Sequence, residues 1–267
     1  MNYLLFPTLL IGAILFAIGI RLSRQTDKGL LKGLFLVALL IALPGILIAL
    51  YYFKILGTPL WLYEFRSVPG SELTAGAAGL LAGLLHGKYS GHATFQRIAG
   101  RYFFPTALTL GLIVPYLKPI VRPPHWGQFQ DQWSDNVCLQ TSESSCGPAC
   151  AATLLRRLGK TATEKEIARA SFTSRNGTEN WYLARTLRQR GCRVEFIHLT
   201  DTAEPWPFPA IAGVRLPGSG NTGHFIAILG PVGDKYVVGD PLVGKLVESQ
   251  SELRGDYDFT GFFMVVK

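Results

Sequence analysis

Apolar residues crowd into the first 120 positions of the chain, whereas the later positions have the mixed pattern of an ordinary globular domain. Three apolar stretches, residues 3–20, 33–53 and about 102–117, approach the length that a helix needs to cross the hydrocarbon core of a bilayer. Pro44 within the second stretch is tolerable, because neighbouring helices can accommodate a kink. The pattern predicts an α-helical transmembrane domain of three to four helices over residues 1–120.

The fourth helix of that range is the open question. Residues 72–87 are apolar but short, so they form either a fourth span or an interfacial or re-entrant helix. The stretch contains the small residues Ala75, Gly76, Gly79 and Gly83, which would let another helix approach closely.

Positive charge favours four spans. One basic loop follows the first span, and a second, with Lys88, Arg97 and Arg101, precedes the last. Four spans place both loops on the cytoplasmic side, as the positive-inside bias requires, and leave the C-terminal domain outside the cytoplasm. Three spans would place that domain inside. We therefore expect an integral protein of a bacterial inner or plasma membrane, with the lipid bilayer as a partner and the C-terminal domain extracytoplasmic.

After a Pro-containing linker over residues 121–135, the pattern of a second domain, 136–267, begins with three helices. The first starts in "CGPACAATLLRRLG" and ends at Gly159. The second begins with a capping box, in which Thr163 precedes Glu166 by three positions. For the third, Thr178 is the expected N-cap and Gly191 the stop.

Strand patterns follow these helices. The segments "CRVEFIHL", "PAIAGVRL", "HFIAILGP", "KYVVGDP", "KLVES" and "GFFMVVK" are separated by Gly, Pro and Asp turns. Helices followed by strands predict an α+β domain in which the helices pack on a mostly antiparallel sheet.

Composition narrows the function classes. The chain has 267 residues, a formal net charge of +8 and 16% charged residues. Its basic residues form no run or stripe, which argues against nucleic-acid binding. Cys146, Cys150 and a histidine lack the second cysteine pair of a common zinc pattern, and "GNTGHF" is not followed by the helix that a phosphate site needs. We expect no metal and no cofactor.

Cys146 is the candidate nucleophile. It stands where a helix begins, and a helix N-terminus favours a thiolate. Gly147 allows close approach of a substrate, and Pro148 is tolerated in a first helical turn. The alternative is a buried structural thiol, which is the expectation for Cys150 one turn later.

A histidine and an acid can be placed beside it. His224 opens the strand "HFIAILG" after the glycine-containing segment "GSGNTG", and Asp240 ends the next strand. If the two strands form a hairpin across residues 231–234, the ends carrying His224 and Asp240 lie side by side. An acid in that place orients the imidazole and fixes its tautomer.

The second domain resembles the papain-like bacteriocin-processing peptidase family in the order of its motifs, which are Gln140, "CGPACAATLL", Gly177–Thr178, "GHFIAILG" and "VGDPLVG". The resemblance covers about residues 136–267 and implies that fold. It also implies that Cys146 is the nucleophile, His224 the base, Asp240 the orienting acid and Gln140 the oxyanion donor. Members of that family cleave leader peptides after a double glycine, often as the N-terminal domain of an ABC exporter.

This chain departs from the exporter members. It has no Walker A motif, the peptidase-like domain follows the membrane helices, and Ser145 stands where many exporters have an acidic residue. We expect a membrane-anchored cysteine peptidase with a peptide or protein substrate and an export system as a partner. Three alternative functions stay open: an amidase or transpeptidase on the same triad, a peptide-binding module without turnover, and a subunit of an export system. A disulfide between Cys138 and Cys192 in an extracytoplasmic domain also stays open.

Overall fold

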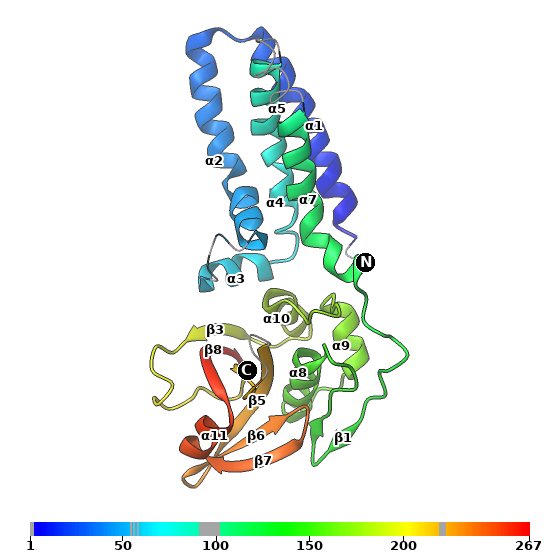
Figure 1. Cartoon of the computed structure of the whole chain (residues 1–267), viewed down its shortest axis with the longest axis vertical. Coiled ribbons are helices and arrows are strands. Elements are labelled where there is room, and N and C mark those ends of the chain that lie inside the picture. Colours follow the sequence, from blue (N-terminus) through cyan, green and yellow to red (C-terminus); the bar gives the residue numbers. More distant parts are fainter. Residues whose placement is uncertain (1–2, 54, 56, 58, 91–101, 219–222) are drawn as a thin grey trace. The chain divides into compact units, whose positions relative to one another are not determined.

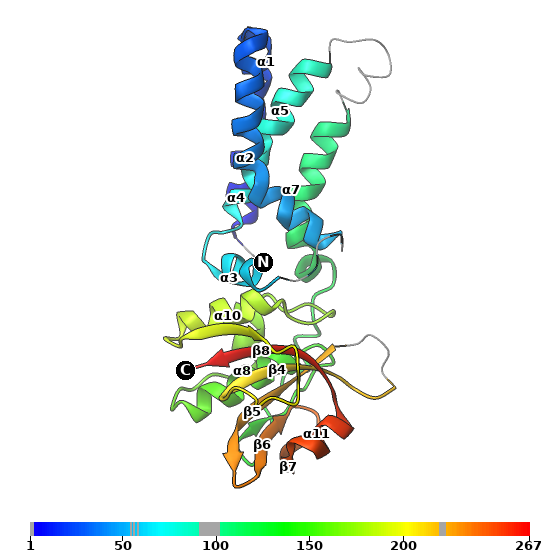
Figure 2. The same ribbon diagram turned by 90° about the vertical axis from the view of Figure 1, so that its left-hand side faces the viewer.

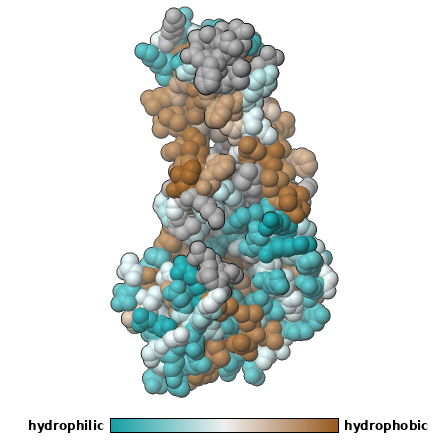
Figure 3. Space-filling model, viewed as in Figure 1, coloured by the Kyte–Doolittle hydropathy of each residue, from teal (hydrophilic) through white to brown (hydrophobic). Residues whose placement is uncertain are grey.

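The computed structural model describes residues 3–267 except 54, 56, 58, 91–101 and 219–222. The basic residues Arg97 and Arg101 and most of the "GSGNTG" segment before His224 therefore lie outside the described residues. The chain divides into two compact units. The helical unit comprises residues 1–58 and 68–118, and the mixed unit comprises residues 59–67 and 119–267. Figure 3 shows mainly apolar residues on the visible middle of the helical unit and a more polar surface over the mixed unit.

The helical unit contains α1 (Leu5–Gln25), α2 (Lys28–Tyr52), α4 (Leu73–Gly76), α5 (Ala78–Tyr89) and most of α7 (Phe104–Val121), seen in Figure 1. Among the described residues, α1 and α2 are the two helices long and apolar enough to cross a membrane. The described apolar part of α7, Phe104–Ile113, is shorter. The ambiguous stretch of residues 72–87 forms α4 and α5, which Ala77 separates.

The small residues of α5 do let another helix approach. A Cβ atom on Gly79 would lie 2.2 Å from the Gly12 carbonyl oxygen, and one on Gly83 would lie 2.1 Å from the Phe16 carbonyl oxygen. Any side chain at these two positions would push α1 and α5 apart. The close packing of small residues predicted for this stretch is therefore confirmed.

The mixed unit has three helices before its main sheet, as predicted: α8 (Cys146–Arg157), α9 (Glu164–Ala170) and α10 (Asn180–Gln189). Gly159 and Gly191 follow α8 and α10 with positive φ angles of 70° and 76°. The capping box of Thr163 and Glu166 is present. Thr178 is not a helix cap: α10 begins after Glu179, and the Thr178 hydroxyl instead lies 2.7 Å from that of Thr173.

The six predicted strands form one antiparallel sheet in the order β3-β8-β4-β5-β6-β7 (Figure 2). Their bounds are β3 Val194–His198, β4 Ala210–Arg215, β5 Gly223–Val232, β6 Lys235–Asp240, β7 Gly244–Ser249 and β8 Asp258–Val266. The α+β prediction is confirmed. One core, which includes Trp206, Ile226 and Phe263, packs against this sheet.

Four elements of the mixed unit were not predicted. Strands β1 (Trp133–Ser134) and β2 (Val137–Cys138) form a two-stranded sheet where the predicted linker meets the second domain. Helix α11 (Gln250–Asp256) begins with a second capping box, Ser249 and Glu252, whose spacing is visible in the sequence. Helix α3 (Leu60–Ser67) belongs to the mixed unit although its sequence lies between α2 and α4.

Candidate active site

Cys146 is the first residue of α8 and is half-buried. The preceding Ser145 does not cap the helix with its side chain; its hydroxyl donates a hydrogen bond to the Ser142 carbonyl at 2.8 Å. The first N–H groups of a helix have no partner within the helix, so they can bind a negative charge. Gly147 is closely surrounded, because a Cβ there would lie 3.3 Å from Leu183 Cδ2 and 3.5 Å from Phe225 Cδ2.

His224 and Asp240 meet as the hairpin geometry predicts. Strands β5 and β6 pair antiparallel, and His224 Nε2 lies 2.9 Å from Asp240 Oδ1. Both side chains are buried, with 6% and 1% of the residue exposed. Because Nε2 faces the carboxylate, Nδ1 is left for the thiol of Cys146, with which the imidazole also forms a hydrogen bond. The structure therefore brings Cys146, His224 and Asp240 together in one contiguous set.

The surroundings of His224 favour its charged form. Burial of the imidazole lowers its pKa, but the hydrogen bonds to Asp240 and Cys146 outweigh burial and raise the pKa of His224 to about 9. An imidazolium at neutral pH is the partner that stabilises a neighbouring thiolate.

Asp240 has two further donors. The Tyr257 hydroxyl donates to Oδ2 at 2.6 Å, and the Leu242 N–H donates to Oδ1 at 2.8 Å. Burial would raise the pKa of Asp240, but the hydrogen bonds from His224, Tyr257 and Leu242 outweigh it and hold that pKa below its usual value. Burial and the Asp240 charge raise the pKa of Tyr257, so its hydroxyl stays a neutral donor. Tyr257 carries no sequence signal of this role.

A main-chain hydrogen bond holds Gln140 beside the residue that follows Asp240. Its N–H donates to the Pro241 carbonyl at 2.9 Å, directly after Asp240. Its side-chain Nε2 donates to the Ser142 carbonyl at 3.1 Å, and an amide group has a second N–H. Thr141, the next residue, is held by the buried carboxylate of Glu164, which accepts from its N–H at 3.0 Å and from its hydroxyl at 2.6 Å.

The other cysteines differ from Cys146. All four cysteines of the chain are free, so Cys138 and Cys192 form no disulfide in this structure. Cys150 is fully buried and its Sγ lies 3.2 Å from the Phe225 carbonyl oxygen, as expected for a core residue. Burial raises the pKa of Cys150, which keeps that thiol neutral. Within the described part of the chain, no three His, Cys, Asp or Glu side chains are grouped as metal ligands.

A thiol at a helix start, a buried imidazole and a carboxylate are the groups that a cysteine peptidase site needs. Residues 134–267 match the model of the Peptidase C39 family, and the chain belongs to this family of cysteine peptidases.

Relatives and solved structures match the same half of the chain. An uncharacterised protein of Methanothermobacter thermautotrophicus is 29% identical over 136 residues, and one of Methanothermobacter marburgensis is 32% identical over 139 residues. Each match spans 49% of this chain and 87% of the relative. The lactococcin-G-processing and transport ATP-binding protein LagD of Lactococcus lactis subsp. lactis is 26% identical over 136 residues, 49% of this chain and 18% of LagD.

Two solved structures match about half of the chain. The peptidase domain of Streptococcus ComA, a bifunctional ABC transporter involved in a quorum-sensing pathway, is 18% identical, with a TM-score of 0.40 over 48% of this chain and 94% of that domain. A double-glycine-motif protease from an AMS/PCAT transporter, solved in complex with the leader peptide, is 20% identical, with a TM-score of 0.42 over 52% of this chain and 94% of that protease.

Proposed function

We propose that the chain is a membrane-anchored peptidase that hydrolyses peptide bonds with Cys146 as nucleophile, His224 as base and Asp240 as orienting acid. The observation that carries this proposal is the position of His224, whose imidazole contacts both the Cys146 thiol and the Asp240 carboxylate.

The reaction uses groups already in place. The Cys146 thiolate attacks the carbonyl carbon of the scissile peptide bond, and the C–S bond forms as the carbonyl oxygen becomes an oxyanion. His224 gives its proton to the leaving nitrogen as the C–N bond breaks, which leaves a thioester on Cys146. His224 then accepts a proton from water, whose oxygen attacks the thioester carbon; the C–S bond breaks, which releases the second peptide and restores the Cys146 thiolate.

Gln140 and the N–H of Cys146 are the proposed oxyanion donors. The second N–H of the Gln140 amide and the free N–H groups at the start of α8 support this role, because neither donor carries a charge that would neutralise the thiolate. The hydrogen bond from Gln140 to Pro241 and the contact of Thr141 with Glu164 fix the loop that carries the amide.

We further propose that residues 1–120, apart from α3, form the membrane anchor and that the peptidase domain, residues 136–267, lies outside the cytoplasm. The length and apolar character of α1 and α2 support insertion in a bilayer. The basic residues Arg21 and Arg24 at the end of α1 support a cytoplasmic loop between α1 and α2.

The substrate we propose is a leader peptide, with an export system as partner. The motif order from Gln140 to Asp240 and the similarity to LagD, a processing and transport protein by name, support this class. Because glycine has no side chain, the backbone of a leader that ends in two glycines could approach Cys146 closely.

The decisive experiment compares the full-length protein with Cys146→Ala in detergent, on a peptide library with and without adjacent glycines. Matched proteomics identifies peptides that accumulate in cells carrying the variant. Hydrolysis after two glycines that disappears with Cys146→Ala supports the proposal. Hydrolysis by Cys146→Ala at the wild-type rate contradicts it. Transfer of the acyl group to an added amine instead of water would identify a transpeptidase, and binding without turnover would identify a binding module.

A further inference from the structure

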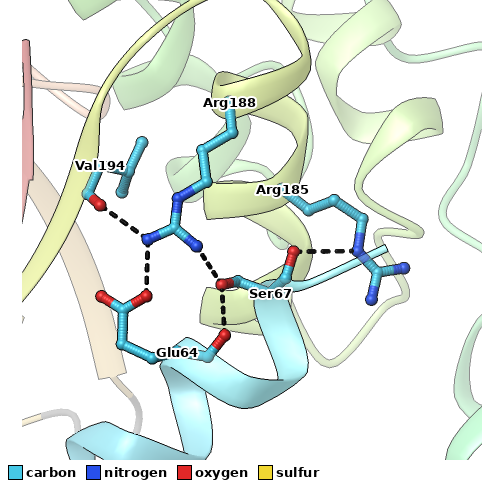
Figure 4. A network of polar contacts seen from close by, with 5 residues as sticks. All are labelled: Glu64, Ser67, Arg185, Arg188 and Val194. Carbon is cyan, nitrogen blue, oxygen red and sulfur yellow. Dashed lines mark hydrogen bonds and ion pairs between the residues drawn. The ribbon is translucent and has the colours of Figure 1, made fainter. Parts of the chain in front are cut away.

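Helix α3 lies in the mixed unit, beside α10 and β3, although no motif of the peptidase family lies in its sequence. Its last turn is held by two arginines of α10 (Figure 4). Arg188 contacts the Ser67 hydroxyl and donates to Glu64 Oε2 at 2.7 Å, and its Nη2 also lies 2.7 Å from the Val194 carbonyl oxygen of β3. Arg185 donates to the Arg66 carbonyl at 2.8 Å. The two arginines thus bind carbonyl and side-chain oxygens of the last turn of α3.

Helix α3 also contributes apolar side chains to its contact with α10, β3 and β8. Leu62 and Tyr63 are buried. The Tyr63 ring centroid lies 6.0 Å from that of Trp181 on α10, 5.4 Å from Phe196 on β3 and 5.6 Å from Phe262 on β8. Because the Glu64–Arg188 ion pair is partly exposed, the burial of Leu62 and Tyr63 contributes more to the docking of α3 than the ion pair does.

The elements that hold α3 also pack near the start of α8. Leu183, two residues after Trp181 on α10, would lie 3.3 Å from a Cβ atom at Gly147. Phe225, the neighbour of His224, would lie 3.5 Å from the same Cβ atom, and its ring centroid lies 6.3 Å from that of Phe262. A packed path therefore runs from Tyr63 through Phe262 and Phe225 to the residue after Cys146.

We propose that α3 is a positioning element of the peptidase, and that its docking on α10, β3 and β8 keeps the start of α8 in hydrogen-bonding reach of His224. This inference rests on the proposed role of Cys146. Protein interiors are close-packed, so loss of a large ring at one end of the path is transmitted to its neighbours. A displacement of about 1 Å between reacting groups is enough to lower a rate strongly. Since α3 lies between α2 and α4 in sequence, the segment between the apolar helices is then required for catalysis.

The test measures alkylation of Cys146 by iodoacetamide in the full-length protein in detergent, by mass spectrometry. At pH 6 the rate reports how well His224 activates Cys146 as a nucleophile, whereas at pH 9.5 it reports mainly access to the thiol. We expect Tyr63→Ala to slow alkylation at pH 6 by about tenfold and at pH 9.5 by less than about twofold. The control is Trp61→Ala, on the 52% exposed side chain of the same helix, which should leave both rates unchanged.

The other cysteines test whether the variant is folded. Cys138 and Cys150 are fully buried and become labelled only if the mixed unit opens. If Tyr63→Ala exposes them, the milder Tyr63→Leu variant decides, with an expected slowing at pH 6 of about threefold. A folded Tyr63 variant that alkylates Cys146 at the wild-type rate at pH 6 overturns the inference. A wild-type Cys146 that reacts at pH 6 no faster than free cysteine instead overturns the proposed function, so the two failures are distinguishable.

Discussion

In the helical unit, contacts between helices depend on the absence of side chains, whereas in the mixed unit the active site depends on side chains with several partners each. Gly79 and Gly83 let α5 lie against the backbone of α1. Asp240 instead accepts hydrogen bonds from three other residues, each from a different part of the fold. The helix packing at Gly79 and Gly83 is disrupted when a side chain is added, whereas the hydrogen bonds to Asp240 are lost when a polar group is removed. Larger side chains therefore test the helical unit, and loss of polar groups tests the active site of the mixed unit.

The largest effect is expected for Asp240→Asn. The amide keeps the shape of the carboxylate but cannot stabilise an imidazolium, so kcat/KM should fall by about 10³- to 10⁴-fold. Peptide hydrolysis by the purified full-length variant measures it. The helical unit should keep its thermal stability, and a loss of activity below about tenfold would remove Asp240 from the proposed triad.

The corresponding change in the helical unit is Gly83→Val. The added atoms would overlap the Phe16 carbonyl, and overpacking of this kind costs about 1–3 kcal/mol. Thermal unfolding in detergent should show a lower Tm. Gly33→Val on α2 is the matched control, because a Cβ at Gly33 meets no atom within 4 Å. Equal Tm values for the two variants would show that the α1–α5 approach is not tight.

The pH dependence follows from His224. Its pKa is raised from 6.5 to about 9, so its contribution to stability is fully present below about pH 6.5 and is lost as pH rises through about 9. The proton that leaves His224 is also the one given to the leaving nitrogen, so kcat/KM should fall over the same upper range. Urea unfolding at pH 6.5 and 9.5 measures the first effect and pH–rate profiles the second. In His224→Gln the pH dependence of stability over this range should disappear.

The smallest effect is expected for Tyr257→Phe, which removes one donor to Asp240 and keeps the ring. We expect kcat/KM to fall by about fivefold, equivalent to about 1 kcal/mol, with little change in KM. Tyr236→Phe is the control, because its hydroxyl accepts a hydrogen bond from the Trp206 N–H, away from the site. If both variants lose stability alike but only Tyr257→Phe loses kcat, the hydroxyl acts through Asp240. Equal kcat values would make its role purely structural.

The sequence predicts those parts of the site that neighbouring segments determine. His224 and Asp240 could be paired because a hairpin brings the ends of adjacent strands together. The capping box at Thr163 and the stop at Gly159 depend on a few adjacent residues, and both were predicted correctly. The role of Thr178 as a helix cap was predicted wrongly, because Glu179 stands one position nearer the helix.

Features that depend on distant partners could not be predicted. Tyr257 lies between α11 and β8 and contacts Asp240 at the end of β6 only through the tertiary fold, and nothing next to Tyr257 in the sequence indicates this. The amphipathic character of α3 shows that one face is covered, but its partners on α10 and β8 are more than 100 positions away in the sequence, so the contact depends on the tertiary fold.

The hydrogen bond between Gln140 and Pro241 has a practical consequence. It completes a circle of contacts from Gln140 along the chain to Cys146, across to His224 and Asp240, and back to Gln140. Each member of this circle is held by its neighbours, so we expect the complete site to form only in a correctly folded molecule. Titration of Cys146 with an irreversible peptidyl electrophile would therefore count correctly folded molecules one by one, and the titrated fraction of a preparation would measure its folding yield.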